Sequence, residues 1–117
     1  MMVNRKIEEL IVEAKKQVDD NPTAEQVIVL VTAKNNMYTC INHCIMDGNY
    51  DDENHFFQML INKADVEVKY LVCMWNNGGL EIPSANFRKQ LLEICSKNTD
   101  AIYCGQGADG IVLRRIV

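Results

Sequence analysis

The sequence contains few of the residues that break regular structure. Only two prolines and six glycines occur in 117 residues, while 48% of the residues are hydrophobic. This composition excludes a disordered, collagen-like or low-complexity chain, because such chains are rich in proline or glycine and poor in apolar residues. The length matches one domain, so we expect residues 1–117 to form a single domain that buries a core without disulfide or metal support.

The chain also lacks a basic surplus and a long apolar run. The chain has 12 Lys and Arg residues but 16 Asp and Glu residues, which gives a net charge of −4. Binding to nucleic acid requires clustered positive charge, so we expect no nucleic-acid partner. No stretch approaches the ~20 apolar residues of a membrane span, and no apolar signal segment follows the first residues. We therefore expect no membrane contact and a cytoplasmic location.

Cysteine is usually a rare residue, but this chain contains five. The odd number of thiols in an expected cytoplasmic protein predicts reduced side chains rather than disulfides. The five positions are Cys40, Cys44, Cys73, Cys95 and Cys104. Whether these thiols hold a metal ion is the first functional question that the sequence raises.

Hydrophobic periodicity predicts three helices. In the first, apolar residues recur at helical spacing from Ile7 to Val18, with Asn4 as its cap and Asn21-Pro22 as its end. Acidic residues at 51–53 open a second helix, whose apolar face we expect to include Ile61 and Ala64. Residues 83–84 open a third helix, with Phe87, Leu91, Ile94 and Cys95 on one side.

Five strands complete the expected architecture. Residues 27–31 form an uninterrupted aliphatic run, which suits a central strand that is covered on both faces. A turn at 34–36 leads to a second strand at 37–42. Further strands are expected at 66–75, 101–104 and 110–117, the last two joined by a glycine-rich turn. Met74 and Trp75 are interpreted as core or subunit-interface residues.

The order α-β-β-α-β-α-β-β predicts a three-layer α/β/α sandwich with a five-stranded mixed sheet. Right-handed crossovers place the second and third helices on one face, and the first helix covers the other. The starts of the second and third helices then meet at the carboxyl ends of the parallel strands, where open α/β sheets usually bind ligands.

The residues at these two helix starts resemble those of the cytidine deaminase superfamily. Members carry His- or Cys-Ala-Glu at the second helix and Pro-Cys-x-x-Cys-Arg at the third, and three of these residues hold a zinc ion. Glu53 falls at the catalytic Glu of this pattern, Asn42 at the nucleoside-binding Asn, and Pro83 and Arg88 at the Pro and Arg. The resemblance covers nearly the whole chain and implies this superfamily's fold, including the hairpin at 107–117.

The zinc motif itself is broken. The three ligand positions hold Asp51, Ser84 and Phe87, and a phenyl ring cannot bind zinc. A catalytic zinc needs three protein ligands and an open water position, so we expect no zinc and no other cofactor. The Phe-x-Val-Gly-Ala-Ala strand of the family is also absent, and residues 25–29 stand near its position.

Each candidate site residue has a structural alternative. Glu53 is either a retained acid/base or part of an acidic first helical turn, and Asn42 either contacts a ligand or binds nearby backbone. Asp51 and Ser84 are candidate ligand contacts. Two other clusters are interpreted as structural. The possible metal ligands Cys40, His43, Cys44 and His55 have irregular spacing, so we expect no metal site there. The glycine-rich segment 105–110 partly resembles a phosphate-binding loop, but no helix follows it, so it indicates a turn.

We therefore expect a cytidine deaminase-like domain that has lost zinc and deaminase activity. It either binds a small nucleoside-like ligand or acts as a homo-oligomeric scaffold, since members of the superfamily commonly assemble. The alternative is an active nucleoside deaminase-type hydrolase with a rearranged site in which Glu53 is the catalytic residue.

Overall fold

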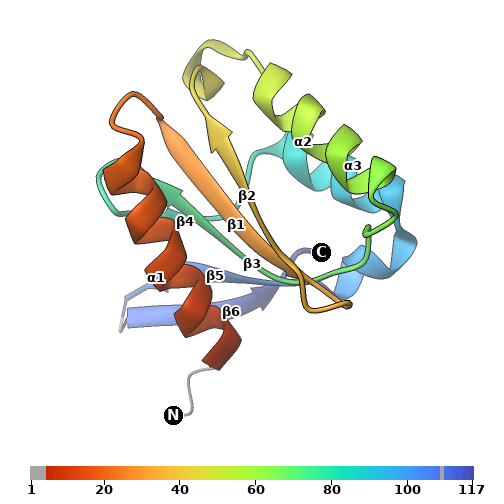
Figure 1. Ribbon diagram of the computed structural model, residues 1–117. Coiled ribbons are helices and arrows are strands. Elements are labelled where there is room, and N and C mark those ends of the chain that lie inside the picture. The colour runs from red at the N-terminus through yellow and green to blue at the C-terminus, as the bar shows by residue number, and fades with distance from the viewer. Residues whose placement is uncertain (1–4, 109) are drawn as a thin grey trace.

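A computed structural model of the protein describes residues 5–108 and 110–117, which form three layers (Figure 1). Helix α1 (Arg5–Asp20) lies on one face of a central sheet. Helices α2 (Asp51–Asn62) and α3 (Ala85–Ile94) lie side by side on the other face. The predicted α/β/α sandwich is therefore confirmed, with each helix on its expected face.

The mixed sheet has a single continuous path of five strands. Its order is β2 (Met37–Asn42), β1 (Gln26–Thr32), β3 (Val68–Trp75), β5 (Ile102–Gly107) and β6 (Gly110–Arg115). Strand β1 runs antiparallel to both neighbours, so β2 and β3 point the same way, and β5 is parallel to β3. The carboxyl ends of β2, β3 and β5 therefore share one edge of the sheet.

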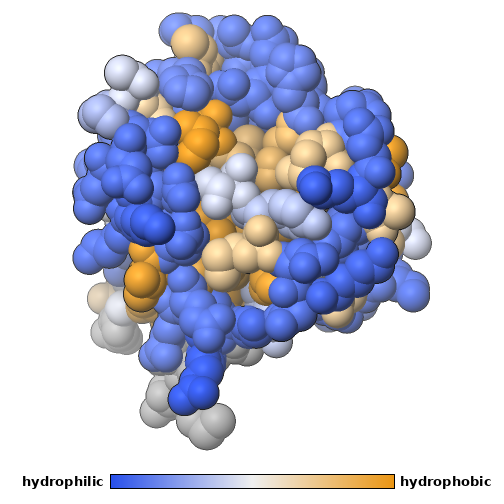
Figure 2. Space-filling model, viewed as in Figure 1, coloured by the Kyte–Doolittle hydropathy of each residue, from blue (hydrophilic) through white to orange (hydrophobic). Residues whose placement is uncertain are grey.

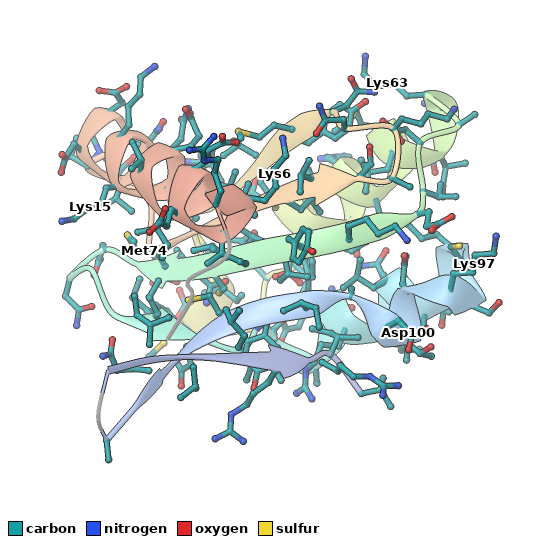
Figure 3. The ribbon with its side chains drawn as sticks, turned by 90° about the horizontal axis from the view of Figure 1, so that it is seen from below. Lys6, Lys15, Lys63, Met74, Lys97 and Asp100 are labelled. Atoms are coloured by element: carbon teal, nitrogen blue, oxygen red, sulfur yellow. The ribbon has the colours of Figure 1, made fainter. Side chains whose placement is uncertain are left out.

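The aliphatic run of β1 is explained by two separate apolar layers. Ile28 and Leu30 pack among core residues of α2 and α3, while Val27 and Val29 pack against α1. All seven residues of β1 are buried, because a central strand between two helical layers has no solvent-facing side. Figure 3 shows the α1 layer from another direction, with Met74 of β3 close beneath the helix.

The structure adds one strand that the sequence did not predict. Leu80–Glu81 forms β4, which pairs antiparallel with β3 after the turn at 76–79 and lies outside the main path. Two residues are too few to produce a recognisable alternation of apolar and polar side chains. The sheet consequently has six strands rather than five.

Two of the expected strands begin later than predicted. The strand expected at 66–75 begins at Val68, because the buried Asn98 side chain binds the backbone on both sides of residue 67. Its Nδ2 donates to the Val66 carbonyl at 2.9 Å, and its Oδ1 accepts from the Val68 amide at 2.7 Å. Likewise β5 begins at Ile102 rather than Ala101. It continues to Gly107 rather than ending at Cys104, so residues 105–107 of the expected turn pair with β6, and β6 ends at Arg115 rather than Val117.

The ends of α2 and α3 correct three predicted burial positions. Helix α2 ends at Asn62; Ile61 is 47% exposed, and Ala64 is exposed with a positive φ of 52°. Helix α3 ends at Ile94, and Cys95 has an extended backbone and is only half-buried. Ile61 lies within α2 but on its solvent side, whereas Ala64 and Cys95 follow the helix ends, where helical spacing no longer applies.

Some predictions concern residues outside the described part of the chain. The cap at Asn4 and the turn residue Asp109 belong to this group, although Gly107 and Gly110 on either side of the turn pair with each other. Within residues 5–108 and 110–117, no helix has the length and apolar character needed to cross a bilayer.

The core at α2 gives the first testable prediction. Phe57 is 1% exposed, and its ring centroid lies 4.6 Å from that of Phe87. We expect Phe57→Ala to lower the free energy of unfolding by about 3–5 kcal/mol, because it leaves a cavity among aromatic rings. Ile61→Ala, on the exposed side of the same helix, should cost about 1 kcal/mol or less. Urea denaturation of both variants checks the difference, and equal losses would contradict this assignment of the core.

Candidate functional site

The residue at the centre of the predicted site is a fully buried carboxylate. Glu53, the third residue of α2, is 0% exposed. Its Oε2 accepts from Asn42 Nδ2 at 3.1 Å, and its Oε1 accepts from Asn86 Nδ2 at 2.9 Å. The Ser84 hydroxyl lies 3.0 and 3.2 Å from the two oxygens. Side chains from β2, from the start of α3 and from the residue before it therefore converge on one carboxylate of α2.

The sheet contributes a row of three side chains to this site. Gln26 at the start of β1 pairs with Asn42 at the end of β2 and with Trp75 at the end of β3. Directly paired residues project from the same face of a sheet, so all three face the α2 and α3 layer. Asn42 Nδ2 also donates to Gln26 Oε1 at 3.2 Å, which joins the row to Glu53.

Ser84 has two roles at the start of α3. It is the N-cap residue, and its Oγ accepts from the Phe87 amide at 3.1 Å. The same hydroxyl donates to Glu53, so capping the helix and binding the carboxylate depend on one atom. One turn later, Arg88 Nε donates to the Pro83 carbonyl at 3.1 Å, which holds the guanidinium against the start of its own helix.

A cleft of about 280 Å³ opens beside this cluster. It lies between the sheet edge, the start of α3 and the segment that leads into α2. Its lining residues are Gln26, Ile45, Tyr50, Trp75, Glu81, Ile82, Pro83, Ser84 and Arg88. Glu53 is not among them, but two of the lining residues, Gln26 and Ser84, belong to its hydrogen-bond network.

A larger hollow of about 430 Å³ lies between α1 and β2. Acidic side chains of α1, together with the exposed Val12 and Met37, form much of its lining. Figure 2 views the molecule from the same direction as Figure 1 and shows hydrophilic surface over the helices, with less hydrophilic side chains over the strands between them. This hollow has no buried polar group among its lining residues, in contrast to the cleft beside Ser84.

The predicted site residues meet only in part. Asn42 and Ser84 both contact Glu53, whereas Asp51 is exposed and its backbone amide donates to Asn49 Oδ1 at 3.0 Å. The Asn42 amide is occupied by protein partners, since its Oδ1 accepts from Cys40 Sγ at 3.5 Å and its Nδ2 binds Gln26 and Glu53. The ligand contacts assigned to Asn42, Asp51 and Ser84 stay predictions.

The donor groups at the family's three zinc positions do not fit a zinc ion. Asp51 faces solvent, the Ser84 hydroxyl is used by Glu53 and Phe87, and Phe87 is 0% exposed. The Phe87 ring stacks on Phe56 at 6.0 Å and contacts Phe57 at 4.6 Å between centroids. Within the described ranges, no three His, Cys, Asp or Glu side chains are grouped so that they could hold a metal ion.

The alternative soft-ligand set is dispersed in the same way. His43 Nδ1 lies 3.1 Å from Asp52 Oδ2 at the surface, and Cys44 and His55 are exposed. Cys40 is buried, and burial raises the pKa of its thiol, which the negative charges of Glu53 and Asp52 raise further. A thiol in this setting stays protonated and is a poor metal ligand.

Sequence reasoning missed three polar or aromatic contributors to this region. Asn86, Gln26 and Tyr50 were not singled out, and Trp75 was interpreted as core or interface. Gln26 carried a weak signal, as a polar side chain that opens an otherwise apolar strand. Asn86 carried none, because its distance from Glu53 is set only when α2 and α3 lie side by side.

Removing the charge of Glu53 tests whether this residue stabilises the fold. Every group that contacts its oxygens carries a donor, so Glu53→Gln places an amide NH2 against donors. We expect a loss of about 1–3 kcal/mol in the free energy of unfolding, because buried polar groups lose their partners. Asp51→Asn, in the same helical turn but exposed, should have little effect. Unchanged or increased stability of Glu53→Gln would show that the carboxylate is not structural.

The accessibility of the thiols provides a second test. Cys44 is exposed, Cys95 is half-buried, and Cys40, Cys73 and Cys104 are buried. Burial raises the pKa of the three buried thiols, so few thiolates are available to react. An aromatic disulfide reagent at mildly alkaline pH should label Cys44 first, then Cys95, and the remaining three only after unfolding. Rapid labelling of Cys40 in the folded chain, located by mass spectrometry, would contradict the burial of this thiol beside Asn42 and Glu53.

Comparisons with known proteins identify a related fold. No model of a known protein family matches the sequence. A search of curated proteins also finds no match. Among solved structures, the cytidine deaminase from Mycobacterium leprae superimposes with a TM-score of 0.65, at 14% sequence identity, over 96% of this chain and 94% of that one. The chain therefore has a cytidine deaminase-like fold.

Proposed function

We propose that this chain is a zinc-independent, non-hydrolytic domain that uses the crevice of a cytidine deaminase-like fold to bind a small molecule. The observation that carries the proposal is the burial and hydrogen bonding of the Glu53 carboxylate. The fold places a carboxylate at the start of α2, but here it is fully buried and bound by side chains of Asn42, Ser84 and Asn86.

A catalytic acid/base must reach the proton that it transfers. A general base works within hydrogen-bond distance of the reacting group, directly or through one water molecule. Glu53 would have to lose the Ser84 and Asn86 contacts before a substrate could approach it. Because Ser84 also caps α3, that rearrangement would weaken the helix start.

The substitutions at the family's zinc positions support the same proposal. Zinc in catalytic sites is bound by imidazole, thiolate or carboxylate groups. Phe87 instead contributes an apolar ring to the core, and the Ser84 hydroxyl is committed to a hydrogen-bond network. A site rebuilt in this way stabilises the fold and no longer supplies an activated water molecule.

The cleft beside Ser84 supports binding as the retained activity. It has a volume of about 280 Å³ and combines apolar, aromatic and charged lining residues, which is typical of small-molecule sites. We propose a small, flat, polar ligand of nucleoside-like or smaller size. From the sequence we also predict a cytoplasmic location and a homo-oligomeric state.

Metal content and hydrolysis test the proposal directly. We expect the protein, purified without chelators and incubated with zinc, to retain no stoichiometric zinc after gel filtration, measured by elemental analysis. It should release no ammonia from cytidine or deoxycytidine. Stoichiometric zinc, or turnover that disappears in Glu53→Gln, would overturn the proposal in favour of a rearranged hydrolase. Glu93→Gln, the same change of side chain at an exposed position of α3 outside the site, serves as the matched control.

A further inference from the structure

One polar atom of a buried side chain at the cleft has no hydrogen-bond partner among residues 5–108 and 110–117. Gln26 is only 2% exposed, and its Oε1 accepts from Asn42 Nδ2. Its Nε2 donates to no acceptor in the part of the chain that the structure describes. Since no fully enclosed side-chain nitrogen or oxygen of the described residues lacks a partner, this nitrogen must reach open space. Gln26 lines the cleft beside Ser84, so its amide group is available to a ligand there.

The positively charged side chain of Arg88 lines the same cleft. Arg88 is half-buried, and its Nε donates to the Pro83 carbonyl, which restrains the guanidinium. Arg88 forms no ion pair with any described carboxylate, so its two terminal nitrogens remain available as donors. The positive end of the α3 dipole lies at the same place, because Ser84 of the cleft is the N-cap residue of this helix. These three features all favour a ligand oxygen that carries negative charge.

Two aromatic side chains line the remaining walls. Trp75 follows Gln26 in the row across the sheet, and Tyr50 precedes α2. The Trp75 Nε1 donates to Glu81, an exposed carboxylate, which holds one edge of the indole. Indole and phenol rings offer flat apolar surfaces against which another ring can pack. With a volume near the lower end of the ~300–1,000 Å³ typical of ligand pockets, the cleft suits a ligand with a single ring system.

We propose that the cleft binds a small planar organic acid. Its carboxylate is bound by Gln26 Nε2 and the Arg88 guanidinium, and its ring packs against Trp75 and Tyr50. This inference rests on the proposed function and narrows the ligand class. It also assigns binding to Gln26 and Arg88 rather than to Asn42, whose amide is fully used by Cys40, Gln26 and Glu53.

Tryptophan fluorescence measures binding at this site directly, because Trp75 is the single tryptophan of the chain. The probes are benzoate, nicotinate and orotate, matched with benzamide, nicotinamide and uracil as neutral compounds, and uridine is added as a neutral nucleoside. We expect saturable changes in emission for at least one acid, and binding about tenfold or more weaker for its neutral counterpart, because charge-assisted hydrogen bonds are the stronger ones.

Three variants locate the carboxylate. Gln26→Glu keeps an acceptor for Asn42 but replaces the donor with a second oxygen, so it should abolish acid binding. Arg88→Gln should weaken acid binding about tenfold or more by removing the cation. Arg115→Gln makes the same change of charge at an ion pair with Asp100 outside the cleft and should bind like the unmodified protein. Thermal melting confirms that each variant is folded, and Arg88→Lys provides a second measurement if Arg88→Gln is not.

The outcomes separate this inference from the proposed function. Equal binding of acids and neutral compounds, acid binding unaffected by Gln26→Glu and Arg88→Gln, or no saturable signal from any acid would overturn the inference. Binding of uridine in preference to the acids would also overturn it, while the proposal of a zinc-independent binding domain would remain. Zinc content and ammonia release, measured on the same preparations, test that proposal independently.

Discussion

The buried carboxylate of Glu53 is the interaction on which the functional half of the molecule depends. Burying a charge is costly unless hydrogen bonds compensate for the lost hydration. The compensation comes from Asn42 on β2, from Ser84 just before α3, and from Asn86 within α3. These groups can satisfy Glu53 only if both helices and the sheet edge adopt one relative position. The carboxylate therefore determines how α2 and α3 meet the sheet.

The same network shapes the adjacent cleft. Asn42 is held by Glu53 and in turn engages the Gln26 oxygen, which leaves the Gln26 nitrogen directed to open space. Ser84 is held by Glu53 and caps α3, and the helix then presents Arg88 one turn later. Glu53 is thus a structural centre, and two residues of its hydrogen-bond network, Gln26 and Ser84, line the adjacent cleft. Networks of buried polar groups commonly have this rigidifying effect when every member is satisfied.

The hydrophobic core extends into one of the positions that the sequence resemblance compares with zinc ligands. Phe87 occupies this position and joins Phe56 and Phe57 in an aromatic cluster between the two helices. Aromatic packing supplies stabilisation through buried area and ring geometry. A carboxylate network and an aromatic cluster therefore link the start of α2 to the start of α3.

Much of the architecture was determined by the sequence alone. The aliphatic run of β1, the periodicity of the three helices and the order of elements identified the three layers, because burial on one or both faces leaves a direct pattern in local sequence. Local sequence patterns did not predict short or irregular features. Strand β4 has only two residues, and the side chain of Asn98 binds the backbone just before and at the start of β3. The broken zinc motif at Asp51, Ser84 and Phe87 was also visible in the sequence, since it depends only on residue identity.

Only the tertiary structure decided which residues surround Glu53. Glu53 and Ser84 are 31 residues apart in the chain, and their contact requires both helices to be packed on the sheet. The free Gln26 amide is likewise a consequence of which of its atoms Asn42 occupies. Hydrogen bonding between distant segments depends on ångström-scale distances that local patterns do not encode. The sequence therefore determined the fold, and three-dimensional packing decided that Glu53 is buried and that Gln26 and Arg88 line the cleft.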